Sequence, residues 1–499
     1  MKQMKVYMIL TGCLLAWPAK INAVELDLSQ VIHIAGDGTV AAFRARNLFL
    51  SKYWEFRNYK ASRRPNLVLH LAPMQYNRDI VKRYISESDL DVYRTQQSLF
   101  SYGNISINQN FALTGGNFYI DSELSFFRHF GQTTTNQFSS VPIRIGYSQS
   151  LLGYNPFKWE KFISTLKYDY AQKEFFYNME EISVSAVSYF FNLVLAECRY
   201  KQAERRTEIS RKLYNEAQER LNMQMISNTD LQTVELLLTE AKNDSIICLN
   251  ARNNAERALL SFLNMPKDIH IDAKIPESIP VDFIPVNEAL HYAKTNHPSF
   301  VEQKQLIMEA RQHVDKTNKE RFMDAEINIS IGFNQIADNF SEVYRKPLQQ
   351  NMAAVSMTIP LIDWGIRKGK YKIAQSNLEM AKNIARQADQ SVEEDIVSIV
   401  DDYNAKVKVA HASMHSIKLA ENILDESMER FRIGKDDINK LNDNMLKVQN
   451  ATYGYISTLY ECWSLFYKIR QMTFYDFQND CSIDTGKGRM LDLMQKKVN

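Results

Sequence analysis

The chain has 499 residues, of which 45% are hydrophobic, and its formal net charge is +2. Because acidic and basic residues are balanced and interspersed, the composition gives no indication of nucleic-acid binding. Past the N-terminus no apolar run approaches the ~20 residues that a membrane-spanning helix needs, so the chain can cross a membrane only as a closed barrel.

The N-terminus predicts export. Two lysines precede an apolar stretch at residues 6–17, and the small residue Ala23 suits cleavage by signal peptidase. We therefore expect residues 1–23 to be a signal peptide. An alternative is that Leu-Thr-Gly-Cys forms a lipobox that ends at Cys13, which would then be a lipidated N-terminus. The apolar stretch continues beyond Cys13, which favours the later cleavage.

Four cysteines remain after the signal. Four in so long an exported chain do not make a disulfide framework, and no pair has the CxxC spacing of a metal or redox site. Cys198 and Cys248 could face each other across a helical hairpin, although two small buried side chains are the simpler interpretation. We expect packing to stabilise the fold without help from these residues: Cys198, Cys248, Cys462 and Cys481.

Long helices are predicted by the near-absence of glycine and proline. Neither residue type occurs between Pro156 and Pro266 or from residue 370 to 433. A helix over residues 159–221 would be on the order of 90 Å long, far longer than a globular core accommodates. Alternating steps of four and three predict coiled-coil packing along two helices. These positions are Ala374, Leu378, Ala381, Ala385, Ala388 and Val392, then Leu441, Met445, Val448, Thr452, Tyr455 and Leu459.

Two interruptions predict that these helices fold back as hairpins. The interruptions lie at residues 220–231 and 430–441, and each begins with arginine and ends with leucine. In the second, Gly434 can provide a left-handed C-cap, and Asp436 or the next aspartate can cap the returning helix. In the first, Ser227 or the following asparagine can serve as N-cap, but no glycine marks the turn.

The chain repeats itself. Residues 28–35 resemble residues 286–293, and each segment is followed by a break, a helix, strand-like sequence and a long helical hairpin. We therefore expect a first structural repeat at residues 24–285 and a second at residues 286–475, with a C-terminal periplasmic tail at residues 476–499.

Several segments alternate apolar and polar residues with the period of a β-strand. Such runs of about ten residues are typical of outer-membrane barrel strands, although a half-buried antiparallel sheet has the same period. About four strands per chain cannot close a barrel, which takes at least eight, so either the sheet is open or several chains share it. The runs lie near residues 105–113, 117–130, 141–151, 327–333 and 353–361.

Taken in this order, the segments resemble the TolC family of outer-membrane efflux proteins over roughly residues 28–475. The junction at residues 355–367 is similar to the family's alternating strand, Pro-Leu and aromatic before glycine. Arg-Phe-Arg-Ile-Gly at residues 430–434 resembles its hairpin tip, and residues 286–298 resemble its short helix ending in Asn-x-Pro.

The resemblance implies a mixed α and β membrane protein that arose by internal duplication. Each subunit of a homotrimer would give about four strands to a twelve-stranded β-barrel, continued by a long periplasmic α-helical barrel. The implied function is the outer-membrane exit channel of a tripartite efflux or type I secretion system, exporting small molecules or polypeptides. The implied partners are outer-membrane lipid, a periplasmic adaptor (membrane fusion) protein and an inner-membrane transporter of RND or ABC type.

The resemblance also assigns candidate site residues. The family's lumen constriction falls on Lys440 and Asp443, and its gate on Phe431 and Asp436, but only Asp443 matches by residue type. A ring of three Asp443 carboxylates would attract cations, whereas a solvated surface charge is the simpler interpretation. The hairpin tips would dock the adaptor through Met223, Met225, Ile226, Ile433, Gly434 and Lys435.

Nothing in the sequence predicts an enzyme, so we expect no catalytic residues, cofactor or metal. His411 and His415 have the i, i+4 spacing of metal ligands, but they lack a carboxylate-rich HExxH context. An alternative function is a periplasmic coiled-coil adaptor or scaffold, which would explain the hairpins but not the alternating strands.

Overall fold

The computed structural model describes residues 24–85, 90–130, 133–151, 153–432 and 438–483. The chain divides into two compact units, and both predicted repeats contribute to each. The predicted signal peptide and most of the predicted tail lie outside the described residues. The first unit, here called the helical unit, comprises Met1–Leu50, Gln172–Pro298 and Gln390–Asn499. The second, the sheet unit, comprises Ser51–Ala171 and Ser299–Asp389.

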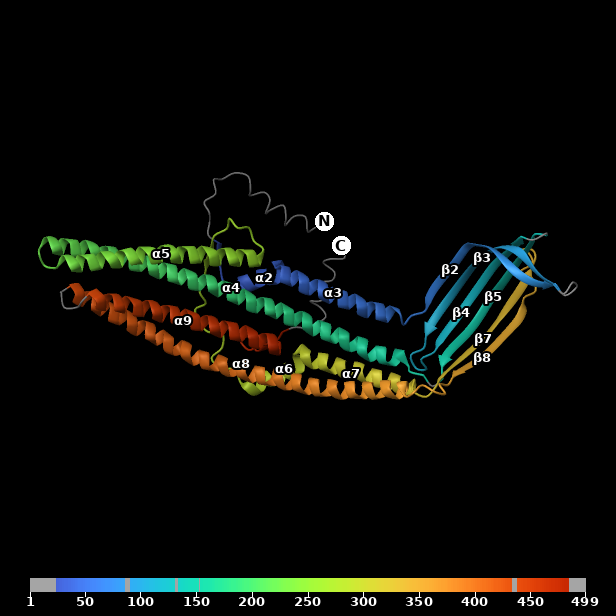
Figure 1. The fold of residues 1–499 in the computed structure, drawn as a ribbon. Coiled ribbons are helices and arrows are strands. Elements are labelled where there is room, and N and C mark those ends of the chain that lie inside the picture. The colour runs from blue at the N-terminus through green and yellow to red at the C-terminus, as the bar shows by residue number, and fades with distance from the viewer. Residues whose placement is uncertain (1–23, 86–89, 131–132, 152, 433–437, 484–499) are drawn as a thin grey trace. The chain divides into compact units, whose positions relative to one another are not determined.

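The sheet unit contains one six-stranded sheet in which every neighbouring pair is antiparallel. The strand order is β2-β3-β4-β5-β7-β8, so β2 and β8 are the two edges, as Figure 1 shows. The strands are β2 (Asn66–Ile85), β3 (Leu90–Asn110), β4 (Asn117–Phe130), β5 (Thr135–Ser150), β7 (Asp324–Ala337) and β8 (Leu348–Thr358).

The expectation of about four strands per chain is wrong, because the sheet has six. The sequence pattern missed β2 and most of β3. The register of this pair shifts between Ala72 and Gln75, and such a bulge reverses the face on which apolar residues lie. The outer half of β2 also carries Arg78, Asp79 and Lys82, which hide the alternation.

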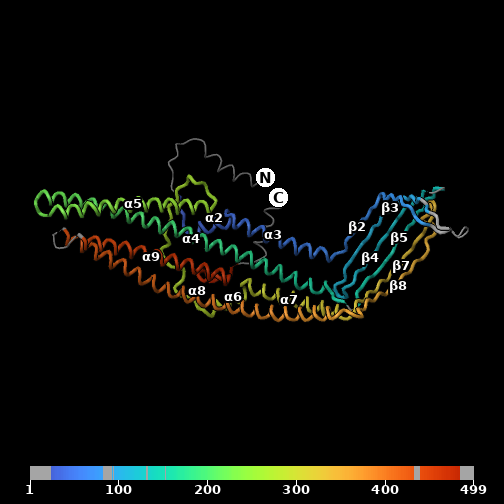
Figure 2. Tube along the Cα trace, in the orientation of Figure 1, coloured from blue at the N-terminus to red at the C-terminus, as the bar shows by residue number. Residues whose placement is uncertain are grey.

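All connections between the sheet and the helices leave from the same end of the sheet. Helix α3 (Val40–Ala61) precedes β2, and α4 (Pro156–Asn222) follows β5. Helix α7 (Pro298–Lys319) precedes β7, and α8 (Ile366–Arg432) follows β8; Figure 2 traces these junctions. Within the sheet unit, Trp159 Nε1 donates to Asp315 Oδ2 at 2.8 Å, which ties α4 to α7.

The helical unit holds α2 (Leu28–Gly38), α5 (Asn228–Leu263), α6 (Val286–Asn296) and α9 (Ile438–Thr473), with the adjoining parts of α3, α4 and α8. Strands β1 (Val24–Leu26) and β6 (Ile271–Ala273) pair in parallel beside them. The core between these elements excludes solvent from large side chains. Its most completely buried members include Phe190, Phe191, Leu193, Leu259, Ile284, Tyr403 and Phe466.

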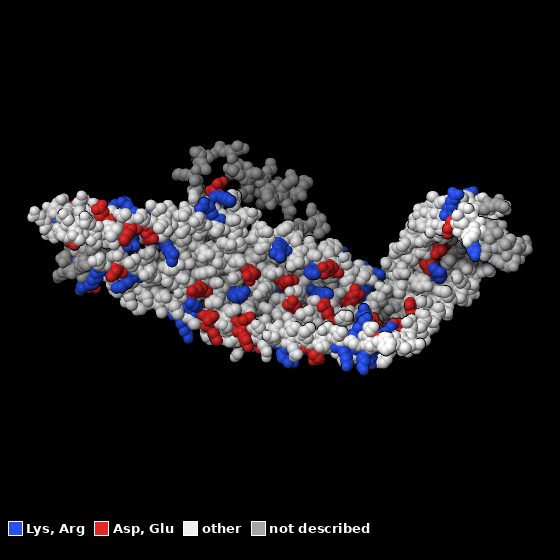
Figure 3. All heavy atoms as spheres, viewed as in Figure 1, with Lys and Arg blue, Asp and Glu red and all other residues white. Residues whose placement is uncertain are grey.

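The predicted coiled-coil seams are confirmed as inward faces. Ala374 and Ala385 are buried on α8, and Leu441 and Leu459 are buried on α9. On α8 the buried positions continue through the helical unit at Ile396, Val400, Tyr403 and Val407. Basic and acidic side chains mix on the outer surface, as the face in Figure 3 shows, which matches the balanced composition.

Helix α4 is, by length and composition, the one described helix apolar enough to cross a membrane. Its apolar stretch includes Phe190 and Phe191, which are fully buried in the core of the helical unit. A buried helix of a protein core has the same composition as a spanning helix. We therefore interpret this stretch as core, in agreement with the sequence analysis.

Candidate functional site

The first candidate site is the end of the helical unit where its two helical hairpins turn. Helix α4 ends at Asn222 and α5 begins at Asn228, so the first hairpin turns where the sequence predicts. Ser227 is the N-cap, and it shares a capping box with Asp230. Gln224 adopts a left-handed φ of 59°, which takes the role that glycine usually has in such a turn.

A small apolar cluster joins the two hairpins near their tips. Phe431 on α8 packs against this cluster, and the Arg220 guanidinium of α4 lies 5.4 Å from the centre of its ring. A cation over an aromatic face at this distance is attractive. The buried members of the cluster come from all four hairpin helices: Leu213, Ala217, Val234, Leu424, Leu441 and Met445.

The predicted docking residues of the first tip divide into two groups. Met223 and Met225 are 68% and 72% exposed, as a docking surface requires. Ile226 is partly buried, because it packs against the apolar cluster between the hairpins. Part of its side chain therefore faces this cluster and the rest stays accessible. Four residues predicted for the second tip and gate lie outside the described residues: Ile433, Gly434, Lys435 and Asp436.

The predicted constriction residues lie in the first turns of α9. Lys440 and Asp443 are both exposed, while Leu441 and Met445 face the apolar cluster. A spacing of three places two helical residues on the same side. Lys440 and Asp443 therefore lie on the same exposed side of α9, a cation beside an anion, as their spacing in the sequence implies.

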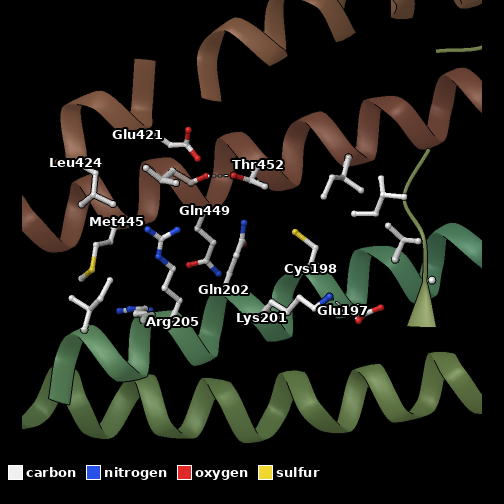
Figure 4. Close-up of a pocket in the computed structure, with 17 residues that line it drawn as sticks. Glu197, Cys198, Lys201, Gln202, Arg205, Glu421, Leu424, Met445, Gln449 and Thr452 are labelled. Carbon is white, nitrogen blue, oxygen red and sulfur yellow. Dashed lines mark hydrogen bonds and ion pairs between the residues drawn. The ribbon is translucent and has the colours of Figure 1, made fainter. Parts of the chain in front are cut away.

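Behind the tips, a cavity of about 360 Å³ opens between α4, α8 and α9 (Figure 4). On the α4 wall, Lys201 Nζ lies 3.0 Å from Glu197 Oε1, whereas Gln202 Oε1 is buried without a hydrogen-bond partner among the described residues. Nearby, Arg206 Nη2 donates to Asn442 Oδ1 at 3.2 Å, which links α4 to α9. Burial raises the pKa of the Cys198 thiol, so this cysteine stays protonated at neutral pH.

Sequence reasoning missed this cavity because its walls come from segments more than 200 residues apart. Cys198 is half-buried and Cys248 is buried, and both thiols are free in the structure. His411 Nε2 lies 3.3 Å from Asp282 Oδ1, and no group of potential metal ligands occurs among the described residues.

The sheet presents a second candidate surface, because one of its faces is apolar and exposed. Cross-strand register aligns a row of aliphatic side chains from β2 to β7. Leu67 and Ile331, at the two ends of the row, are 68% and 56% exposed. Val355 and Met357 carry the same face onto β8. The complete row is Leu67, Ile107, Ile120, Ile145 and Ile331.

The opposite face of the same sheet is polar. Asp121 is only 5% exposed and accepts two hydrogen bonds from Arg144, at 2.9 Å from Nε and 2.6 Å from Nη2. Asn104 Nδ2 also donates to Asp121, at 3.2 Å. This bidentate pair bridges β4 and β5, and the neighbouring serine on β3, Ser106, belongs to the same register row. The sheet is therefore apolar on one face and polar on the other.

Comparison with known proteins gives a consistent fold. No protein-family model matches the sequence, and no curated protein matches it. Among solved structures, the chain is similar to the Campylobacter jejuni CmeC outer membrane channel, with a TM-score of 0.65 and 12% identity over 97% of this chain and 93% of that one. The outer membrane protein VceC of Vibrio cholerae gives 0.63 and 12%, over 89% and 95% of the two chains.

A third structure, the open state of the Neisseria gonorrhoeae MtrE outer membrane channel, gives a TM-score of 0.60 and 14% identity over 95% of both chains. Nearly the whole of each chain is covered in all three comparisons. The chain therefore has the fold of outer-membrane channel proteins, which the sequence analysis inferred from its resemblance to the TolC family.

Proposed function

We propose that this chain is the subunit of an outer-membrane exit channel in a tripartite efflux or type I secretion system. The observation that carries the proposal is the two-faced sheet. Its apolar face is exposed over six strands, and β8 has 11 residues, the length that a tilted strand needs to cross a bilayer. The connections to the helices all leave from one end of this sheet, and the fold of the chain is similar to that of solved outer membrane channels.

The subunit is proposed to act as a homotrimer. Six strands are too few to close a barrel, and the exposed edges β2 and β8 need partners within a membrane. The helical hairpins would then extend into the periplasm. The exported substrate would pass through the shared lumen, and the chain would contribute no catalytic chemistry.

The hairpin tips are proposed to bind the periplasmic adaptor, which would connect the channel to an inner-membrane transporter of RND or ABC type. Met223 and Met225 are large, flexible and exposed at the first tip. Methionine side chains suit contacts with a partner helix because they adapt to its surface. Ile226 is proposed to hold the tip in shape from within.

Lys440 and Asp443 are proposed to line the periplasmic constriction. In a trimer, three copies of each would place six charges of both signs around the lumen. The test is single-channel conductance of the purified protein in a planar bilayer. Asp443→Asn should reduce the preference for cations, and Lys440→Gln should increase it, because rings of charge set ion selectivity at short range.

Membrane fractionation provides the independent control. The proposal expects a heat-modifiable trimer in the outer-membrane fraction for the parent and for both variants. Recovery of the parent in the soluble periplasm would contradict the channel and would favour an adaptor or scaffold. Unchanged selectivity in an inserted, conducting trimer would remove these two residues from the constriction while leaving the channel in place.

A further inference from the structure

We propose that neighbouring subunits pair edge strand β2 with edge strand β8, so that the trimer closes a barrel of eighteen strands, six from each of three chains. This inference rests on the proposed trimeric channel, but it concerns the interface between copies of the chain. It replaces the twelve-stranded barrel that the family resemblance implies.

The first argument is that the edge needed for a twelve-stranded barrel is already occupied. Such a barrel would use only β4, β5, β7 and β8, and β8 would pair with β4 of the next copy. Strand β3 covers this edge of β4 along its full length, from Gln97 opposite Phe130 to Asn110 opposite Asn117. Closure at β4 would therefore require the loss of a complete strand pairing, whose backbone groups would remain unsatisfied in the membrane.

The second argument is direction. Strand β2 starts at the end of the sheet that bears the helices, whereas β8 finishes there. The two edges of a six-stranded antiparallel sheet run in opposite directions. Related by rotation about the barrel axis, β8 of one copy and β2 of the next are therefore antiparallel, as in other membrane barrels. The first residue of β2, Asn66, and the last residue of β8, Thr358, both lie at the helix-bearing end of the sheet, so the two edges start at the same level.

The third argument is the lack of protection on these edges. Natural sheets guard exposed edges with charges, proline or bulges. Strand β8 contains no charged residue, and neither does β2 between Asn66 and Ala72. The protective features of β2 begin only at the bulge and Pro73, and continue with charged residues farther out. The unprotected segments of the two edges thus lie at the same height.

The fourth argument is continuity of the apolar face. Leu67, Leu69 and Leu71 on β2 are 68%, 58% and 66% exposed, and Val355 and Met357 on β8 are 60% and 57% exposed. When the two edges pair, these side chains complete an unbroken apolar belt around the assembly. The outer parts of β2 and β3 extend beyond the end of β4, since β3 begins to pair with β4 only at Gln97. This overhang would project past the membrane.

An eighteen-stranded barrel has a practical consequence for export. Barrel diameter grows roughly linearly with strand number, so the pore would be about one and a half times as wide as a twelve-stranded one. Barrels of this size leave a water-filled lumen. The outer-membrane section would then accommodate bulky cargo, and selection would occur elsewhere along the channel.

The test is disulfide cross-linking between subunits of the full chain, in a background where its native cysteines are replaced by alanine. Val68→Cys and Ser356→Cys are combined, because both residues lie on the polar face near the helix-bearing end. Oxidation should link chains into covalent dimers and trimers on a denaturing gel. Ala354→Cys and Thr358→Cys, each with Val68→Cys, extend the test to adjacent registers on the same face.

The matched control is Tyr119→Cys with Ser356→Cys, which the twelve-stranded arrangement would bring together. We expect no link for this pair or for any single cysteine. Links through Tyr119→Cys, or none through Val68→Cys in any register, would overturn the eighteen-stranded barrel if the protein is trimeric and in the outer membrane. A soluble monomer would instead contradict the proposed channel, and this interface with it.

Discussion

The helical unit and the sheet use the same apolar residue types in opposite ways. In the helical unit, Phe190 and Leu259 are fully buried, and the apolar faces of the helices meet one another. In the sheet, Ile331 and Leu67 are more than half exposed, so the described residues of the sheet unit leave its apolar face accessible. The same residue types are thus buried within protein in one region and left exposed in the other, and the proposed channel would cover the exposed face with lipid.

The largest effect is expected when one phenylalanine in each region is replaced by alanine and the two losses of stability are compared. Phe190→Ala should cost about 3–5 kcal/mol of stability, because it removes a fully buried ring and leaves a cavity. Phe333 lies on the apolar face of β7 and is 42% exposed, so Phe333→Ala should cost about 1 kcal/mol or less of stability. Chemical denaturation of the detergent-solubilised protein, followed by circular dichroism, gives both values. Equal losses would mean that the face of the sheet is packed against protein.

A second prediction charges the two faces of the sheet in turn. Val355→Arg places a cation on the apolar face near one end of β8 and should destabilise membrane insertion by about 1–2 kcal/mol, less than a cation at the bilayer midplane would. Ser356→Arg, the adjacent residue on the polar face, should be tolerated, since that face meets water. The measurement is the fraction of heat-modifiable protein in the outer membrane. A greater loss for Ser356→Arg would reverse the assignment of the faces.

A third prediction examines how well the core of the helical unit excludes water from His297. Burial lowers the pKa of His297 from its ordinary value of 6.5 to about 4, with help from Lys173 and Lys468. Between these two values the unfolded chain binds a proton that the folded chain does not. Stability therefore falls as pH decreases from about 6.5 to 4, by at most about 3 kcal/mol, and this contribution levels off below that range.

The measurement is the midpoint of urea unfolding at pH values from 4 to 7.5, compared between the parent and His297→Gln. The variant should lose this part of the pH dependence, whatever its absolute stability. A parallel slope in both proteins would show that His297 remains accessible to protons in the folded chain. That result would contradict the exclusion of water from this part of the helical unit.

Much of the fold is predictable from the sequence because its signals are local. Absence of glycine and proline identifies the long helices, and steps of four and three locate their inward faces. Alternation identifies four of the six strands and the last part of a fifth, β3. The turn of the first hairpin is encoded at Ser227 and Asp230, which form the N-terminal cap of α5. The sequence also pointed to the channel fold through its resemblance to a known family.

The candidate site was less predictable, because its geometry depends on residues distant in sequence. Arg220 meets Phe431, and Arg206 meets Asn442, only after the two hairpins pack together. Ile226 turns inward for the same reason, although its neighbours Met223 and Met225 remain exposed as expected. Local pattern cannot distinguish these three residues, since all are large and apolar.

By itself, the sequence determined the type of the long helices and of most strands, because backbone propensity and periodicity depend on neighbouring residues. Only the tertiary structure decided how many strands share the sheet, which strands form its edges, and which side chains close the tips. The bulge between Ala72 and Gln75 shows why: it reverses the alternation of β2, and only pairing with β3 restores the register. That added pair of strands covers β4 and leaves β2 and β8 as the edges through which copies of the chain are proposed to meet.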